Sequence, residues 1–351
     1  MGTAIVATLT ETLGGPVAGG RSIAVVFLVL AWGVLLGLTV AFAGRVLRSP
    51  GALGATVSDV AALTSWGMVA MGVVSVGAAT ATVVPAHRSG LIEAAWLADG
   101  VLWVIGTTLG VVTALGFGMR LVGREAGAPT TTWGLPLVPP MVSATAGAAL
   151  VPHVASRAAR LWLVVGLVGC FLLALSLAIV VFAVAYHHHW RVAPLPLAAS
   201  ATAWLPLGVV GQSVAAAQAI AARAEAFVLP ADVGTVQRIA DVYGVVVLAA
   251  GAPLAAWAAF RTAVGLVRGM PFSPSWWAMT FPVGTLCLGA HALATGTGAA
   301  PLNGVATAAL VALLGTWTLC AAATVRAVAP TLVRRRARRP DRSTGPAVAT
   351  E

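Results

Sequence analysis

Long apolar segments with few charges dominate this chain, and they constrain its fold more than any other feature. Each segment can cross about 30 Å of hydrocarbon as a helix, because such a crossing takes roughly 20 residues. A helix also satisfies its own backbone N–H and C=O groups inside a bilayer. Nine such segments can be placed, at residues 22–46, 59–84, 92–122, 133–153, 160–186, 195–222, 238–266, 275–297 and 303–328. The chain is therefore predicted to be an all-α, multi-pass integral membrane protein.

A tenth segment at the start of the chain is too short to cross a bilayer. Residues 1–10, MGTAIVATLT, are apolar but would rise only about 15 Å as a helix. Counting this piece as helix 1, alternate segments recur about every 70 residues, which predicts repeated helical hairpins. We expect ten helices in five hairpins around a central pore, with helix 1 truncated because the start codon is misassigned. A gene without in-frame apolar codons upstream of Met1 would contradict that expectation.

Prolines and small polar residues gather in the odd-numbered segments. Proline removes a backbone donor, and in a membrane it is tolerated mainly beside other helices or a watery cavity. Helix 8, with Pro253, is the exception. The predicted kinks are Pro139, Pro140, Pro206 and Pro282, and the predicted pore-lining residues are Thr3, Ser143, Gly147, Gly208, Gly211, Gln212, Ser213, Gly284 and Thr285. The alternative is that the small residues only allow helices to pack closely.

The charge distribution predicts an orientation. The chain carries 20 arginines, no lysine and 10 acidic residues, for a net charge of +10. If the C-terminus is cytoplasmic, 14 arginines lie on that side and six on the other, which fits the positive-inside rule for an inner (plasma) membrane. The basic run from Arg334 to Arg342 directly follows the last segment and suits lipid headgroups better than nucleic acid. We therefore expect residues 1–330 to form the membrane domain and residues 331–351 a disordered cytoplasmic tail.

No cluster of residues in the sequence suggests catalysis. The three cysteines all lie in apolar segments, and neither HExxH nor GxSxG occurs. Three consecutive histidines, His187 to His189, point in different directions around a helix and make a poor metal site. We expect no metal, no cofactor and no enzymatic activity. Two acids inside segments, Asp99 and Asp241, are either interfacial acids with polar partners or members of a proton relay.

Three stretches resemble a known family. They are WGLPLVPPMVSATAG at 133–147, WLPLGVVGQSVAAA at 204–217 and FSPSWWAMTFPVGTLCLGA at 272–290. Together they resemble the tellurite-resistance and dicarboxylate transporter family, which includes fungal malate permeases, fungal sulfite exporters and the slow-type anion channels of plant guard cells. The resemblance implies five hairpins with pseudo-fivefold symmetry, inner odd-numbered helices around a pore, and a homotrimer.

The resemblance also implies a gate and a substrate class. A phenylalanine on the ninth helix plugs the pore in this family, and Phe281 matches that position; the alternative is that Phe281 is one more lipid- or core-facing aromatic. The implied function is transport of a small anion, such as malate or another C4-dicarboxylate, sulfite, tellurite, nitrate or chloride. Selectivity would come from broken helix ends, freed backbone N–H groups and hydroxyls. Channel and proton-coupled carrier both remain open, and so does a structural or regulatory membrane subunit without transport.

Overall fold

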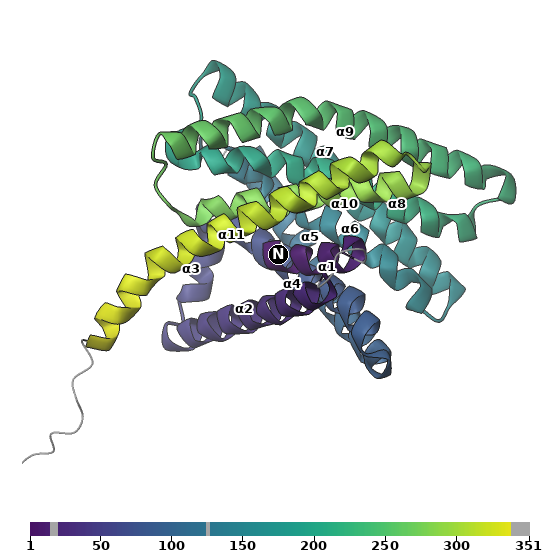
Figure 1. Cartoon of the computed structure of the whole chain (residues 1–351), viewed down its shortest axis with the longest axis horizontal. Coiled ribbons are helices and arrows are strands. Elements are labelled where there is room, and N and C mark those ends of the chain that lie inside the picture. The colour runs from purple at the N-terminus through teal and green to yellow at the C-terminus, as the bar shows by residue number, and fades with distance from the viewer. Residues whose placement is uncertain (15–19, 124–126, 338–351) are drawn as a thin grey trace, which may run out of the picture.

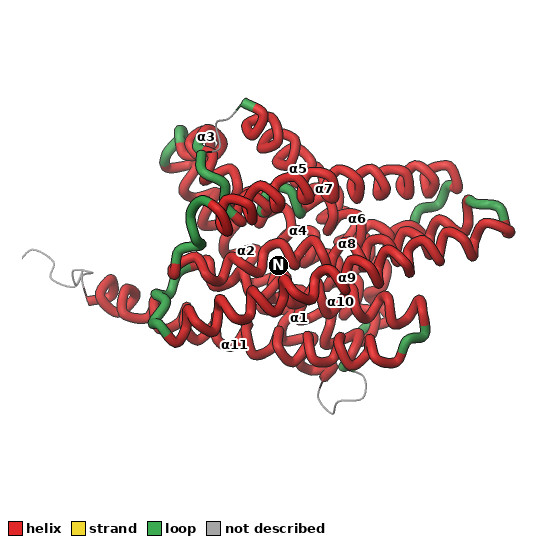
Figure 2. The backbone as a smooth tube through the Cα atoms, turned by 90° about the horizontal axis from the view of Figure 1, so that it is seen from above, coloured by secondary structure: helices red, strands yellow, loops and turns green. Residues whose placement is uncertain are grey.

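The computed structural model describes residues 1–14, 20–123 and 127–337 of the chain, and within those ranges it contains helices and no strands. The α-helices are α1 (Gly2–Leu13), α2 (Gly20–Arg48), α3 (Ala52–Ser58), α4 (Val60–His87), α5 (Ile92–Val122), α6 (Pro139–Leu150), α7 (Arg157–Arg191), α8 (Leu205–Ala224), α9 (Pro230–Val267), α10 (Thr280–Thr297) and α11 (Ala300–Ala337). Six 3₁₀ helices join them, η1 (Ser89–Leu91), η2 (Thr131–Gly134), η3 (Val151–His153), η4 (Leu197–Trp204), η5 (Glu225–Phe227) and η6 (Pro274–Met279). Figure 2 shows the bundle from above.

Nine helical spans in the described part of the chain are long and apolar enough to cross a membrane. They coincide with the nine predicted segments, and several extend beyond them. Helices α7 and α9, for example, have 35 and 38 residues, because helical hydrogen bonding continues past the apolar stretch through polar residues such as His187 to His189. The short N-terminal piece forms α1, with 12 residues. The last helix continues to Ala337, and residues 338–351 of the predicted tail lie outside the described residues.

Burial alternates along the chain, as the distribution of prolines and small residues predicts. The spans that contain α4, α6, α8 and α10 are 67–89% buried, whereas those of α2, α5, α7, α9 and α11 are only 17–28% buried. The side chains of Ala4, Val6 and Leu9 in α1 are fully buried, so α1 belongs to the inner set. In Figure 1, α1 lies at the centre of the bundle, while α2 and α9 lie along opposite edges. Helices α1, α4, α6, α8 and α10, which are the odd-numbered segments of the sequence prediction, therefore form an inner layer. The even-numbered segments, which correspond to α2, α5, α7, α9 and α11, surround it.

Three inner spans begin with a 3₁₀ turn that passes into an α-helix near a proline. The pairs are η2 with α6, η4 with α8 and η6 with α10. Pro139 and Pro140 begin α6, Pro206 is the second residue of α8, and Pro282 is the third residue of α10. These prolines therefore lie inside the membrane spans but at the starts of their α-helices. Proline is best tolerated in the first helical turn, where its fixed φ suits the helix and its missing N–H is not needed.

The five inner helices run in the same direction. At their starts, the Thr131 hydroxyl in η2 donates to the Thr202 hydroxyl in η4 at 2.8 Å, and η4 packs against η6. At their ends, Arg223 Nε in α8 donates to the Ala148 carbonyl in α6 at 3.1 Å.

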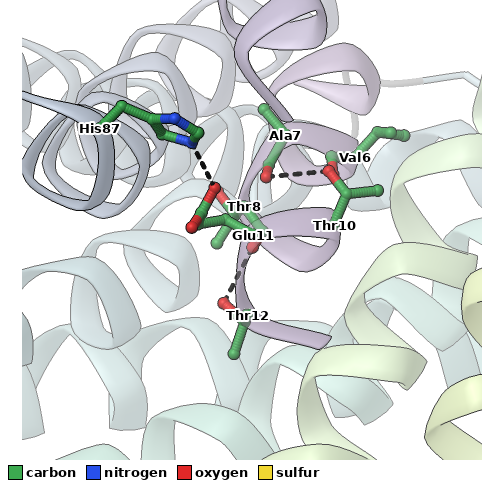
Figure 3. Close-up of polar contacts among 7 residues, drawn as sticks. All are labelled: Val6, Ala7, Thr8, Thr10, Glu11, Thr12 and His87. Atoms are coloured by element: carbon green, nitrogen blue, oxygen red, sulfur yellow. Dashed lines mark hydrogen bonds and ion pairs between the residues drawn. The ribbon is translucent and has the colours of Figure 1, made fainter. Parts of the chain in front are cut away.

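Two further inner helices are linked at the same ends. His87 Nε2 at the end of α4 lies 3.0 Å from Glu11 Oε2 near the end of α1 (Figure 3). In the same view, Thr10 of α1 bonds within its own helix, to the carbonyls of Val6 and Ala7. All five inner helices thus point their N-terminal, electropositive ends to one side of the molecule.

Candidate functional site

A cavity of about 240 Å³ lies between the first halves of the inner helices. Every inner span contributes to its wall: Met1 beside α1, Met68 and Met71 of α4, Thr132, Gly134, Leu135 and Val138 of the η2–α6 span, Thr202, Leu205 and Gly208 of the η4–α8 span, and Pro274, Ser275, Trp277, Ala278, Phe281 and Pro282 of the η6–α10 span. No side chain in this set is charged. The wall is therefore largely apolar, with hydroxyl groups as its main polar side chains.

Phe281 lies where the five inner helices converge. It lines the cavity as the second residue of α10, and its side chain is only 4% exposed. It belongs to the same buried cluster as Ile5 of α1, Met71 of α4, Val138 at the start of α6 and Val209 of α8. One residue from each of the other inner spans thus shares this buried cluster with the Phe281 ring.

Two further predicted site residues reach the cavity wall, Gly208 and Pro282. A Cβ added at Gly208 would lie 3.6 Å from Pro282 Cγ, an ordinary van der Waals distance, so Gly208 is there without steric need from a neighbouring backbone. The other predicted prolines are buried outside the wall. A Cβ added at Gly110 of α5, for example, would lie 2.6 Å from Pro139 Cβ, which shows how closely α5 approaches the start of α6.

Three predicted pore glycines face neighbouring helices. A Cβ on Gly147 would lie 2.5 Å from Leu167 Cδ2 of α7 and 2.7 Å from Trp103 Nε1 of α5. One on Gly284 would lie 2.8 Å from Ile5 Cγ2 of α1, and one on Gly211 would overlap the backbone carbonyl of Thr285 in α10. At these positions the alternative interpretation, that glycine allows close helix packing, describes the contacts.

The predicted polar residues mostly bond within or between helices. Ser213 donates to the Val210 carbonyl at 3.1 Å and Thr285 to the Pro282 carbonyl at 2.8 Å, each within its own helix. Thr3 turns outward, where its hydroxyl accepts a 3.1 Å hydrogen bond from Trp317 Nε1 of α11.

Two polar groups between α6 and α8 are left without partners. Gln212 Nε2 donates to Thr145 Oγ1 at 2.9 Å, while Gln212 Oε1 and Ser143 Oγ are buried and have no hydrogen-bond partner among the described residues. An unpaired buried polar atom costs about 1–3 kcal/mol, so these two oxygens lie at a place where a polar solute or water would be stabilised.

Sequence reasoning missed the hydroxyl residues in the wall of the cavity. They are Thr132 in η2, Thr202 in η4 and Ser275 in η6. Each precedes a Trp that is followed within a few residues by one of the buried prolines, in TWGLP, TAWLP and SWWAMTFP. This recurrence was the available signal, and it marks a hydroxyl residue near the start of three consecutive inner spans.

Backbone N–H groups are not freed at the junction of η2 and α6. Leu137 N–H donates to the Gly134 carbonyl at 3.0 Å and Met141 N–H to the Val138 carbonyl at 2.9 Å, so these donors are bonded across the turn that joins η2 to α6. Proline lacks a donor and therefore frees the carbonyl of an earlier turn, not an N–H. Of the polar features expected in the pore, this junction supplies the helix dipole and hydroxyls but no free donors.

The two acids inside segments have different surroundings. Asp241 Oδ1 accepts hydrogen bonds from Gln218 Nε2 and Gln237 Nε2, both at 2.9 Å. Asp99 in α5 is 1% exposed, and neither of its carboxyl oxygens has a hydrogen-bond partner among the described residues. Neither acid lines the cavity. Asp241 thus has the polar partners that an interfacial acid needs, whereas Asp99 does not.

A comparison with protein families agrees with this architecture. The family model for SLAC1, the voltage-dependent anion channel, matches residues 1–325. The chain belongs to the SLAC1 family. The match spans all five inner helices and confirms the resemblance seen in the three proline-containing stretches. A comparison with curated proteins found no match.

Membership in the SLAC1 family assigns the chain to a general class. Members of the family are anion channels and transporters and not enzymes, which fits a multi-pass membrane protein with an uncharged cavity among its inner helices. Within this SLAC1-family chain, the cavity and the ring of Phe281 are the features on which a more specific function can be argued.

Proposed function

We propose that this chain conducts small monovalent anions through the cavity and past Phe281, which closes the path in the conformation described. The observation that carries the proposal is the convergence of all five inner spans on one cavity that has no charged side chain and has Phe281 in its wall. In this proposal five helical hairpins surround the path, and the inner member of each hairpin forms its wall.

Electrostatics support an anion over a cation. The inner helices point their N-terminal ends toward the cavity, and each helix carries about half a positive charge at that end. The end of the molecule on that side also carries the exposed arginines Arg45 and Arg48, which raise the local concentration of anions. Hydroxyls of Thr132, Thr202 and Ser275 at the entrance offer dipoles to an ion that has shed part of its water.

The absence of charged side chains in the cavity wall also bears on which anion passes. Taking an ion out of water is costly unless it is paired, and the cost is higher for a dianion than for a monovalent ion. A C4-dicarboxylate such as malate would need cationic partners that the cavity wall does not supply. Nitrate and chloride are therefore favoured over malate, sulfite or tellurite dianions, and passive conduction is favoured over a proton-coupled carrier because no ionisable side chain lines the cavity.

Orientation and assembly complete the proposal. The arginine distribution supports an orientation in which the cavity and the C-terminus lie toward the cytoplasmic side of the inner membrane. The family resemblance supports a homotrimer in which each subunit holds its own path.

The test is anion flux in liposomes that contain only this protein. We expect low nitrate and chloride flux from the wild type, and higher flux from Phe281→Ala because the ring no longer fills the point of convergence. Phe260→Ala is the matched control, since Phe260 on α9 is 64% exposed on the outer surface. Equal flux from Phe281→Ala and Phe260→Ala, in protein that assembles normally, would remove the gate. No flux from any variant would favour a structural or regulatory subunit.

A further inference from the structure

A second cavity lies away from the proposed path, beneath the short helix α3. It has a volume of about 520 Å³ and is lined by residues of three helices: Leu53 and Val57 of α3, Leu63 and Trp66 of α4, and Leu109, Val112, Thr113, Gly116, Met119 and Arg120 of α5. We call this cavity the α3 hollow. Its wall is apolar apart from Thr113 and Arg120, and Arg120 lies at its end near the C-terminus of α5.

Helix α3 covers the hollow without burying any residue of its own. Its seven residues include no buried side chain, and Leu53 and Val57 are four residues apart, so they share one face. Polar contacts hold the helix in place. Arg120 donates to the carbonyls of Ser58 at 2.9 Å and Val57 at 3.1 Å, and Trp66 Nε1 donates to Thr56 Oγ1 at 3.3 Å. The helix is thus fixed by these polar contacts over a space that the protein does not fill.

The hollow opens to the surroundings within a membrane span. It follows α5 inside the candidate span Ser89–Val122, and Val112 and Met119 on its wall are 63% and 71% exposed. Close packing is the rule in protein interiors, and an apolar space of this size does not retain water. In a bilayer the molecules next to such an opening are lipids, so hydrocarbon is the material that fits its chemistry.

The arginines near the hollow favour a lipid with an anionic headgroup. The exposed Arg45 and Arg48 lie in the last turn of α2, which leads directly into α3, and Arg120 lies at the end of α5. Within residues 20–123, one acid, Asp59, lies beside these arginines in the sequence, at the end of α3, so the three positive charges outnumber it. Arginines at the level of the headgroups attract anionic phospholipids, and a guanidinium matches the geometry of phosphate.

We propose that the α3 hollow is a binding site for an anionic phospholipid, with one acyl chain beneath α3 and the phosphate beside Arg45 and Arg48. The lipid comes from the leaflet on the arginine-rich side of the molecule. Binding would fasten α3 to α4 and α5 and complete the packing that the protein leaves open there. The wall of the hollow is separate from the wall of the proposed anion path, because none of its residues lines the central cavity.

Native mass spectrometry of the purified full-length protein tests the site with phosphatidylglycerol and phosphatidylcholine of identical acyl chains. We expect the wild type to retain phosphatidylglycerol in preference to phosphatidylcholine. Gly116→Leu should lose the adduct, because Gly116 lines the hollow and an added Cβ meets nothing within 4 Å. Gly166→Leu on α7 is the matched control, since its added Cβ also meets nothing within 4 Å and it lies outside the hollow.

Two further variants separate the parts of the site. Val112→Phe fills the same hollow from an exposed position and should also lose the adduct, which covers the case in which Gly116→Leu fails to fold. The double variant Arg45→Gln with Arg48→Gln should lower retention of phosphatidylglycerol to that of phosphatidylcholine. Equal retention of both lipids by the wild type, or unchanged retention in both filled variants, would overturn the proposal. A change of oligomeric mass in those variants would also overturn it and assign the face to a second copy of the chain.

Discussion

The crossing of α8 and α10 provides a sharp test of which glycines maintain the fold and which shape the cavity. Gly211 and Gly208 lie one turn apart on α8, and both were expected to line the pore. In the structure an alanine methyl at Gly211 would overlap the backbone carbonyl of Thr285, whereas one at Gly208 would lie 3.6 Å from Pro282 Cγ. The same substitution should therefore have opposite consequences at the two positions.

The size of the destabilisation can be judged from the same helix crossing seen from α10. A Cβ on Gly289 of α10 would lie 2.5 Å from the Gly211 carbonyl oxygen, about 0.9 Å closer than the 3.4 Å at which ordinary contact begins. The neighbouring atoms are backbone, so the two helices must separate. Overpacking of this kind typically costs about 1–3 kcal/mol and occasionally more. We expect Gly211→Ala to lie at or above the upper end of that range, and Gly208→Ala to change stability little.

Unfolding in a series of SDS concentrations, followed by loss of helical circular dichroism in mixed micelles, measures the difference. Flux in liposomes supplies the second measurement, because Gly208→Ala places a methyl group in the cavity wall and should lower anion flux in a protein that remains stable. If Gly211→Ala proves as stable as both the wild type and Gly208→Ala, the argument from close backbone approach is refuted.

Three further predictions concern the path and its surroundings. Phe281→Leu should give a flux between those of the wild type and Phe281→Ala, since its side chain is intermediate in size; a flux outside that interval in the liposome assay would contradict gating by bulk. Asp241→Asn should retain anion flux at every pH tested, because Asp241 lies outside the cavity and its Oδ1 accepts hydrogen bonds from two glutamine amides, so loss of pH-driven uptake would restore the relay hypothesis. Thr131→Val removes the hydrogen bond that the Thr202 hydroxyl accepts, while that hydroxyl still donates to the Ala199 carbonyl, and should cost about 0.5–1.5 kcal/mol in the SDS assay. A double-mutant cycle with Thr202→Val that shows no coupling energy would mean that this bond does not hold η2 to η4.

The sequence by itself determined that this protein lies in a lipid bilayer and which of its helices are inner and which are outer. Apolar segments of this length require a bilayer, and each of the nine became a helix because no other open structure satisfies its backbone there. The contrast between spans rich in proline and small residues and uniformly apolar spans such as α7 was enough to separate inner helices from outer ones. That contrast can be seen within a single segment, because the polarity of each side chain decides whether it can face lipid.

Tertiary structure decided which inner residues face the cavity and which face a neighbouring helix. Gly208 and Gly211 are indistinguishable as types, yet one lines the cavity and the other lies against the Thr285 backbone. Thr3 was expected in the pore and instead bonds Trp317, more than 300 residues away in the chain. Rotation of a helix about its axis depends on every helix that packs against it, so periodicity within one segment cannot fix it when all sides are apolar or small. For the same reason the α3 hollow, which forms between three helices that leave a space unfilled, could not be seen in any one of their sequences.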